Sequence, residues 1–207
     1  MTSDDIKAMM VAVADAMDAA RDELCALDGE IGDADHGIAM AGGFGAVRKA
    51  IAAMDGGTPT DVFNSAAKAF LNAVGASSGP LYATAFMRAG MTVKGKDRLD
   101  DSDAQQLVAA MAEGIAARGK ASLGDKTMLD AWQPAANAAM EANGQKAAVV
   151  FSSAADAAEK GAEATTALEA KLGRAARLGA RSVGHKDPGA ASAALMLRAM
   201  SNSLAGG

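Results

Sequence analysis

The fold class can be read from one stretch near the start of the chain, SDDIKAMMVAVADAMDAARDELCAL, residues 3 to 27. Its apolar residues recur at three- and four-residue steps, which places them on one face of an α-helix. They are Ile6, Met9, Met10, Val13, Met17, Ala20, Leu24 and Leu27. Ser3 is a candidate N-cap, and Asp4 and Asp5 complement the positive end of the helix dipole. We therefore predict one amphipathic helix over residues 3 to 27.

Similar apolar spacing continues along the rest of the chain, interrupted by glycine-rich or polar turns. At the last of these turns, Asp187 and Pro188 are suited to the N-cap and first position of a helix. No stretch is typical of a linker between domains. We predict one all-α domain over residues 1–207, built from eight helices. After the first, they cover about 36–54, 58–74, 77–93, 102–118, 124–143, 146–168 and 187 to the C-terminal region.

The composition supports a helical protein over one built from strands. Of 207 residues, 54 are alanine and only 3% are aromatic. Alanine has the highest intrinsic helix propensity, whereas aromatic and β-branched residues favour sheets. The composition therefore favours an all-α protein and argues against a β-sandwich or β-barrel.

Charge and hydropathy exclude further classes. A formal net charge of -5 without a basic block argues against nucleic acid and anionic membrane surfaces as partners. No apolar run approaches the roughly 20 residues that span a bilayer. Met1 to Asp5 lack the positive region of a signal peptide, and Cys25 has no second cysteine with which to pair. We expect a cytoplasmic protein.

Three aspartates, Asp28, Asp33 and Asp35, lie within eight residues between two predicted helices. Glycines among them permit turns that could aim the carboxylates at one point. Clustered carboxylates repel unless a cation lies between them, and oxygen ligands favour Mg²⁺, Mn²⁺ or Ca²⁺ over zinc. The alternative is a solvated acidic turn that caps the second helix.

Two other aspartate motifs do not fit this stretch. An EF-hand loop starting at Asp33 requires glycine at its sixth position and glutamate at its twelfth, where this chain has Ile38 and Gly45. An Asp-x-Asp phosphotransferase nucleophile normally follows a buried strand, and here a helix precedes it. The spacing by itself leaves a cation site and a capping turn as the two interpretations.

Three turns have the character of anion-binding helix starts: Ser77-Ser78-Gly79-Pro80, Gly124-Asp125-Lys126-Thr127 and Asp187-Pro188-Gly189. Free backbone N–H groups and the positive dipole end favour an anion at such positions. No Walker A or GxGxxG pattern occurs. Each turn alone is also explained as a helix cap, but several beside an aspartate cluster suggest a phosphate site.

A basic segment from Gly173 to Asp187 contains three arginines, Lys186 and His185. In an acidic protein it forms a local positive patch suited to phosphate or to charge in a transition state. Its alternative is a basic C-terminal end of the seventh helix that complements the dipole. His36 and His185 are the only histidines, and neither spacing alone makes a metal site.

Together these segments resemble the nucleotide-binding L subunit of dihydroxyacetone kinases and the equivalent C-terminal domain of the single-chain enzymes. The matching segments occur in the order of that family and span most of the chain. They are Leu27–Gly37, Ser77–Leu81, Gly119-Lys120 with Gly124–Met128, Gly173-Arg174 and Gly184–Ala190.

The resemblance implies an antiparallel barrel of eight α-helices with ATP or ADP at one end, its phosphates held through two Mg²⁺ ions. It implies Asp28, Asp33 and Asp35 as Mg²⁺ ligands and Arg174 as the residue that stabilises developing charge. The residues implied around the nucleotide are His36, Gly37, Ser77, Ser78, Gly119, Thr127, Met128, Arg174, Asp187, Pro188 and Gly189.

The implied reaction is transfer of a phosphoryl group to a hydroxyl of a short ketose, dihydroxyacetone or a C4 ketose such as erythrulose. A separate K-type subunit holds the ketose in this family, so this chain alone would be half an enzyme. The donor stays open between exchangeable ATP and ADP recharged in place by a phosphoprotein of the phosphoenolpyruvate system. A homodimer is compatible with the sequence, which leaves the oligomeric state open.

Ala39 departs from the family pattern, which usually has asparagine there. The change removes an amide but no carboxylate, so metal binding is still expected. It gives some support to the competing hypothesis, a non-catalytic nucleotide-sensing module that binds a regulator.

Overall fold

The computed structural model describes residues 1 to 75 and 78 to 205, and these contain nine α-helices, two 3₁₀ segments and no strand. The prediction of an all-α protein is therefore confirmed. The α-helices are α1 Ser3–Ala19, α2 Arg21–Ile31, α3 His36–Ala52, α4 Pro59–Ala73, α5 Gly79–Thr92, α6 Asp101–Gly119, α7 Leu129–Glu141, α8 Ala147–Ala164 and α9 Pro188–Ala205. The 3₁₀ segments are η1 Thr165–Ala167 and η2 Ala175–Ser182.

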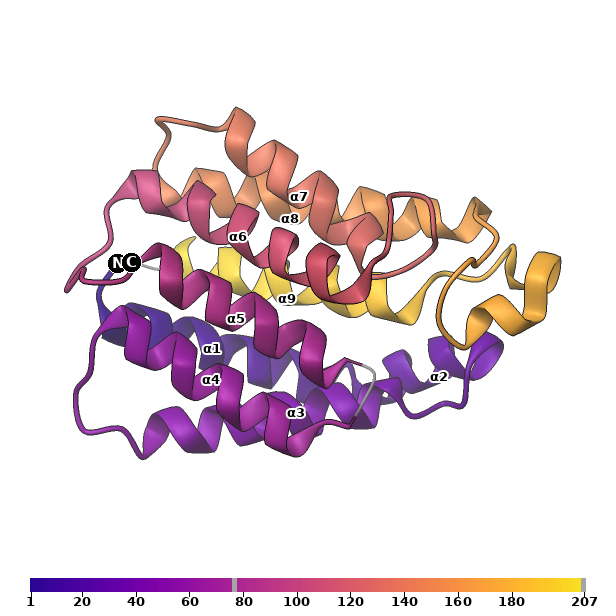
Figure 1. Ribbon diagram of the computed structural model, residues 1–207, viewed down its shortest axis with the longest axis horizontal. Helices are drawn as coiled ribbons and strands as arrows, with labels where there is room; N and C mark the ends of the chain where they lie inside the picture. Colours follow the sequence, from indigo (N-terminus) through magenta and orange to yellow (C-terminus); the bar gives the residue numbers. More distant parts are fainter. Residues whose placement is uncertain (76–77, 206–207) are drawn as a thin grey trace.

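Eight of these helices form a closed ring. From α3 to α9 each helix packs against the next, and α1 packs against both α3 and α9, which closes the ring. Neighbouring helices run in opposite directions along the long axis of the molecule (Figure 1). The arrangement is the predicted antiparallel barrel of eight helices. The ninth helix, α2, lies at one end and packs against α3 and α9.

Aromatic side chains from α3, α4 and α5 fill part of the barrel interior. The ring of Phe44 meets Phe70, Tyr82 and Phe86 edge-on, with centroids 5.0, 5.9 and 6.2 Å apart. All four residues are fully buried. Elsewhere the helices meet through alanine, as at the fully buried Ala135, and small side chains let helix axes approach closely. Buried alanines also lie on the helices that carry the aromatic cluster, as at Ala66 in α4 and Ala85 in α5, so small and aromatic side chains share one core.

Several helix starts follow from local chemistry that the sequence displays. Thr58 caps α4: its hydroxyl accepts the N–H of Asp61, whose carboxylate accepts the N–H of Thr58, with Pro59 at the first helical position. This reciprocal pairing satisfies two backbone donors that a helix start leaves free. Asp187 caps α9 in a related way, because its Oδ2 accepts the N–H of Ala190 at 2.7 Å.

The prediction of one helix over residues 3 to 27 is wrong in its bounds. The first helix, α1, ends at Ala19, and a second helix, α2, begins after Ala20 and continues to Ile31. The apolar spacing runs across the break without a glycine or proline to mark it. The reason is tertiary, since α2 buries Leu24 and Ile31 at the end of the barrel instead of extending α1.

Other boundaries also differ from the prediction, and the predicted helix 146–168 ends at Ala164, before η1. The sixth predicted helix starts at Leu129 instead of Gly124, after a loop in which Lys120 and Lys126 have positive φ. The α6 helix starts at Asp101, one residue before the predicted start, and is capped by Asp100, while α1 is capped by Thr2 and not by Ser3. In both helices an acidic residue three positions after the cap completes a capping box, which favours the earlier start.

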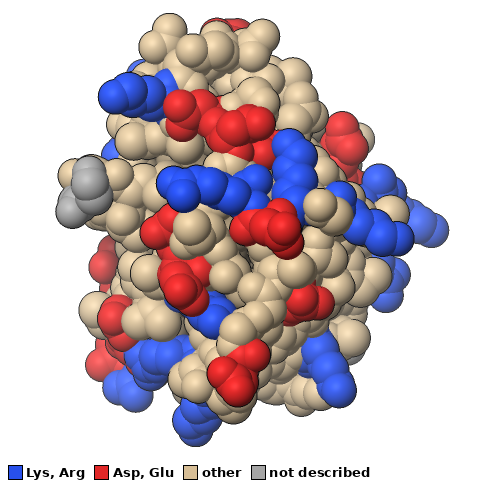
Figure 2. Space-filling view, turned by 90° about the vertical axis from the view of Figure 1, so that its left-hand side faces the viewer, with Lys and Arg blue, Asp and Glu red and all other residues tan. Residues whose placement is uncertain are grey.

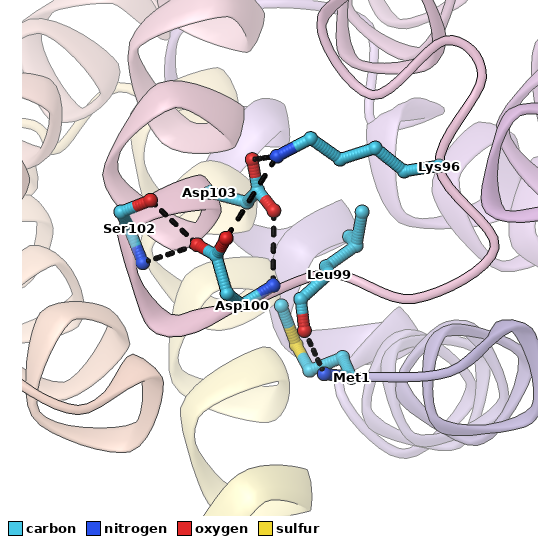
Figure 3. A network of polar contacts seen from close by, with 6 residues as sticks. All are labelled: Met1, Lys96, Leu99, Asp100, Ser102 and Asp103. Carbon is cyan, nitrogen blue, oxygen red and sulfur yellow. Dashed lines mark hydrogen bonds and ion pairs between the residues drawn. The ribbon is translucent and has the colours of Figure 1, made fainter.

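The barrel has two chemically different ends. One end carries both chain ends and the turns 53–58, 93–100 and 142–146 (Figure 1). Lysines, arginines and carboxylates alternate over it without a continuous patch of one sign (Figure 2). Its polar groups satisfy each other: the Met1 amine donates to the Leu99 carbonyl at 2.6 Å, and Lys96 pairs with Asp103 at 2.6 Å (Figure 3).

Among the described residues, none of the helices combines the length and the apolar character required to cross a bilayer.

The aromatic cluster should carry a large share of the stability. We predict that Phe44→Ala lowers the free energy of unfolding by about 3–5 kcal/mol, because the cavity removes contacts with three aromatic rings. Leu71→Ala on α4 is the control, since Leu71 is 46% exposed and its loss should change stability little. Urea denaturation of both variants measures this, and equal losses would contradict the packing described.

Candidate functional site

The end of the barrel opposite the chain termini contains a pocket of about 420 Å³. Loops and helix starts from distant parts of the chain meet there, beside α2 (Figure 1). Most of the residues expected from the sequence line it. They are Asp28, Asp33, Asp35, His36, Ser78, Gly119, Thr127, Met128, Arg174, Asp187, Pro188 and Gly189. Segments more than 150 residues apart in sequence are thus brought together as the resemblance implies.

The three aspartates of the cluster converge at one edge of the pocket. One carboxylate oxygen from each of Asp28, Asp33 and Asp35 lies within 4.8 Å of the other two. Asp28 is buried at the end of α2, while Asp33 and Asp35 are exposed in the short loop before α3. Three negative oxygens at this separation repel one another, and a hard divalent cation is the ligand that such an all-oxygen set fits.

The capping interpretation holds for one of the three aspartates. Asp28 Oδ2 accepts the backbone N–H groups of Asp35 and His36 at 3.0 and 3.3 Å, and so stabilises the start of α3. Asp35 occupies the N-cap position of α3, but its side chain makes no capping hydrogen bond. The carboxylate of Asp35 therefore does not cap α3, and it remains available to a cation.

Arg174 lies directly against this cluster. Its guanidinium forms an ion pair with Asp33 and lies 3.6 Å from an oxygen of Asp35. The side chain is about half exposed, so solvent screens the pairs, and the contact says more about position than about stability. It places a permanent positive charge beside the carboxylates, where it could also reach an anionic group in the pocket.

A second part of the pocket wall, formed by the starts of α5, α7 and α9, offers hydrogen-bond donors. Ser78 at the start of α5 is buried, and its hydroxyl has no partner among the described residues. Thr127 precedes α7, and Pro188 and Gly189 open α9. Helix starts carry free N–H groups and the positive dipole end, so this wall suits an anion. An unpaired buried hydroxyl facing such a pocket fits a ligand that would satisfy it.

Asp187 is an unusual carboxylate at the pocket floor. It is 8% exposed, and burial raises its pKa to about 7, with the nearby charges of Asp130 and Asp28 adding to the rise. The hydrogen bond from the Ala190 N–H and the charge of Lys126 act in the opposite direction. The carboxyl thus changes its protonation near neutral pH.

His36 follows Asp35 directly and is held in a fixed orientation. Its Nε2 lies 2.8 Å from Ser192 Oγ, and the Ser192 hydroxyl donates to the Gly189 carbonyl at 3.0 Å. His36 Nε2 is therefore the donor to Ser192. Burial lowers the pKa of His36, although Asp28 partly opposes this, and the ring remains neutral at physiological pH.

Two of the expected residues are not among those that line the pocket as described. Ser77 lies outside the described residues. Gly37 does not line the pocket: it is buried at the start of α3, where an added Cβ would overlap the carbonyl oxygen of Arg21 in α2. In this structure the glycine therefore allows two helices to approach closely.

Two residues with evident roles were missed from the sequence. Asp130 holds the turn before α7, because its two oxygens accept the N–H groups of Gly124 and Thr127 at 2.5 and 2.8 Å. The capping-box spacing from Thr127 to Asp130 is the signal that could have revealed it. Lys126 lines the pocket, yet it is 1% exposed and donates to backbone carbonyls.

A helical barrel with clustered carboxylates and anion-binding helix starts at one end defines a class of nucleotide- or phosphate-binding proteins, and comparisons with known proteins identify the family. The model of the DAK2 domain family matches residues 30–202. The chain belongs to the DAK2 domain family.

Two curated relatives illustrate the range of this family. The "PEP-dependent dihydroxyacetone kinase 1, ADP-binding subunit DhaL" of Listeria innocua is 40% identical over 174 residues, covering 84% of this chain and 83% of the relative. The "L-erythrulose 1-kinase" of Mycolicibacterium smegmatis is 37% identical over 185 residues, covering 88% of this chain but 32% of that longer protein.

A solved structure shares the fold. The crystal structure of the dihydroxyacetone kinase from C. freundii, in complex with AMP-PNP and Mg²⁺, matches with a TM-score of 0.72 and 24% sequence identity. The match covers 95% of this chain and 33% of that chain. At this identity the likeness shows the fold alone.

The raised pKa of Asp187 predicts a pH dependence of stability. Its pKa is about 7 in the folded protein against an ordinary value of 3.8, so the folded state holds an extra proton between these values. The stabilisation it gives is full below pH 3.8 and is lost as the pH rises through about 7. Asp187→Asn should abolish this loss, which amounts to as much as about 1.4 kcal/mol per pH unit, while keeping an acceptor for the Ala190 N–H.

The measurement is chemical denaturation between about pH 5 and about pH 7 without divalent ions. Asp61→Asn is the control, because hydrogen bonds from Thr58 lower the pKa of Asp61 and its effect falls below this range. Parallel stability curves for the wild type and Asp187→Asn would contradict the raised pKa.

Proposed function

We propose that this chain is the nucleotide-binding subunit of a dihydroxyacetone-type kinase. The observation that carries the proposal is the meeting of three carboxylates, Arg174 and several anion-binding helix starts around one pocket. Relatives aligned over most of their length are named ADP-binding subunits of dihydroxyacetone kinases, which agrees with this chemistry. Phosphoryl transfer depends on positioning and charge neutralisation more than on covalent participation by the protein.

The carboxylates of Asp28, Asp33 and Asp35 would hold Mg²⁺, and we propose two ions, as the family resemblance implies. Their donor set is entirely oxygen, which fits this metal. Bound Mg²⁺ supplies neutralisation of phosphate charge. Asp28 is fixed by the α3 amides that it caps, so it would give the site a rigid edge, while Asp33 and Asp35 can adjust from the exposed loop.

The residues that would face the nucleotide have three roles: a positive charge, hydrogen-bond donors and the sides of the pocket. Arg174 would stabilise negative charge that develops on the transferred phosphoryl group. Ser78 and Thr127 would donate hydrogen bonds to phosphate oxygens from the starts of α5 and α7. His36, Met128, Pro188, Gly189 and Gly119 would form the sides of the pocket, with Asp187 capping α9 beneath them.

The ketose and the phosphate donor complete the proposal. We infer that a separate K-type subunit presents dihydroxyacetone or a C4 ketose, as the family resemblance implies. Relatives named for dihydroxyacetone and for erythrulose support this substrate class. A phosphoprotein of the phosphoenolpyruvate system would recharge bound ADP, which agrees with relatives named PEP-dependent and PTS-dependent.

Removal of one carboxylate tests the metal site. We predict that Asp33→Asn weakens binding of Mg²⁺–ADP by roughly tenfold or more, because a metal ligand loses its charge. Isothermal titration calorimetry gives the affinity. Asp22→Asn on the exposed start of α2 is the control and should bind like the wild type. Equal affinities for Asp33→Asn and wild type would remove Asp33 from the ligand set.

A turnover assay separates the kinase from a nucleotide-sensing module. The chain, combined with a K-type subunit and a ketose, should form ketose phosphate with ATP or with a phosphoprotein donor. Arg174→Ala should reduce the rate by roughly 100-fold while Mg²⁺–ADP affinity changes less, because its charge acts on the transition state. Tight Mg²⁺–ADP binding without turnover with either donor would favour the sensing module.

A further inference from the structure

Lys126 is a buried cation without a carboxylate partner among the described residues. Its side chain is 1% exposed, and its ammonium lies within hydrogen-bond distance of four backbone carbonyls. The oxygens are those of Thr165 at 2.8 Å, Leu168 at 3.1 Å, Ser182 at 2.8 Å and His185 at 2.5 Å. The four oxygens replace water around the charge, which a buried ammonium requires.

All four carbonyls come from one segment, residues 165–185, which joins α8 to α9. This segment has little apolar core of its own, since Thr165, Ala170 and Ser182 are its only buried residues. It folds back on itself, with the Gly184 N–H donating to the Thr166 carbonyl at 2.8 Å. The Lys126 ammonium thus binds both arms of the segment, residues 165–168 and residues 182–185.

The contacts of Lys126 argue against a direct role in binding phosphate. An ammonium has three N–H donors, and four carbonyl acceptors already surround it. No donor remains for a ligand in the pocket, although the residue lies beside Thr127 in an anion-binding turn. Burial lowers the pKa of Lys126, and the negative charge of Asp187 partly opposes this. The four carbonyl acceptors favour the charged form, because a neutral amine has only two N–H donors.

The segment held by Lys126 carries Arg174 and leads to Asp187. We propose that Lys126 is a positioning residue, whose ammonium holds residues 165–185 in the shape that sets Arg174 against Asp33 and Asp35. The link between this shape and catalysis rests on the proposed kinase function. The link between Lys126 and the shape of the segment does not, and each can be tested separately.

The first experiment measures the segment itself by tryptic cleavage after Arg177 and Arg181, which are both exposed. Lys126→Ala should increase cleavage there roughly tenfold, because the arms lose their common partner. Lys120→Ala is a matched control: Lys120 is exposed in the same loop and also has positive φ, 54° against 60° for Lys126. The two substitutions therefore impose similar backbone strain, and cleavage in Lys120→Ala should equal that of the wild type.

Chemical rescue distinguishes a cation site from simple loss of packing. The space left in Lys126→Ala is lined by four carbonyls, so added ammonium or methylammonium should restore protection from trypsin. Tetramethylammonium cannot donate hydrogen bonds and should not restore it. Lys126→Met keeps an apolar chain of similar length, so it should show increased cleavage that ammonium does not reverse. Failure of ammonium to rescue Lys126→Ala, or unchanged cleavage in Lys126→Met, would overturn the proposal.

Wild-type protein provides a measurement that needs no variant. The ¹⁵Nζ resonance of Lys126 should persist at neutral pH in nuclear magnetic resonance spectra, because its protons are shielded from water. Loss of every lysine Nζ signal through solvent exchange would contradict the carbonyl cage. This result tests the carbonyl cage even where a variant fails to fold.

The catalytic consequence is tested last, with the K-type subunit present. Lys126→Ala should lower kcat by roughly 100-fold, with little change in KM for the ketose, and ammonium should restore kcat. An unchanged kcat alongside increased cleavage would overturn the positioning role. Absence of turnover in the wild type would instead count against the proposed function, while the cleavage and rescue results still decide the role of Lys126.

Discussion

Closure of the helical ring, by packing of α9 against α1, is the constraint on which the rest of the structure depends. In a closed ring of antiparallel helices, successive connections fall at alternate ends. Residues distant in sequence are thereby gathered at one end, so that Asp28, Gly119 and Asp187 line the same pocket. The opposite end receives both termini and a set of charges that pair among themselves.

The candidate site collects like charges that the barrel must hold together. Three carboxylates converge, and their repulsion is opposed by the α3 amides on Asp28 and by Arg174 beside Asp33. The buried aromatic and alanine core provides the rigid frame from which these groups project. The segment that carries Arg174 has few buried residues of its own. Lys126 attaches this segment to the barrel through hydrogen bonds to its backbone carbonyls.

Much of this arrangement could be predicted from the sequence, for reasons that are local. Apolar periodicity and caps such as Thr58 indicate helices directly, and the spacing of Asp28, Asp33 and Asp35 suggests convergence. The break at Ala20 could not be predicted, because the packing of α2 over the barrel end decides it. The role of Lys126 could not be predicted either. Its four partners are backbone carbonyls 39 to 59 residues away in sequence, and no side-chain motif indicates such contacts.

The central claim is that a divalent cation and a nucleotide bind together at the Asp28–Asp35 end of the barrel. Mn²⁺ in place of Mg²⁺, added with ADP to ¹⁵N-labelled protein, tests this most directly, because the paramagnetic ion broadens the resonances of nearby amides. The account predicts broadening at Asp33, Asp35 and His36 and none at Leu99 or Asp103 on the opposite end. Broadening centred elsewhere, or the same pattern in Asp33→Asn with undiminished affinity, would contradict it.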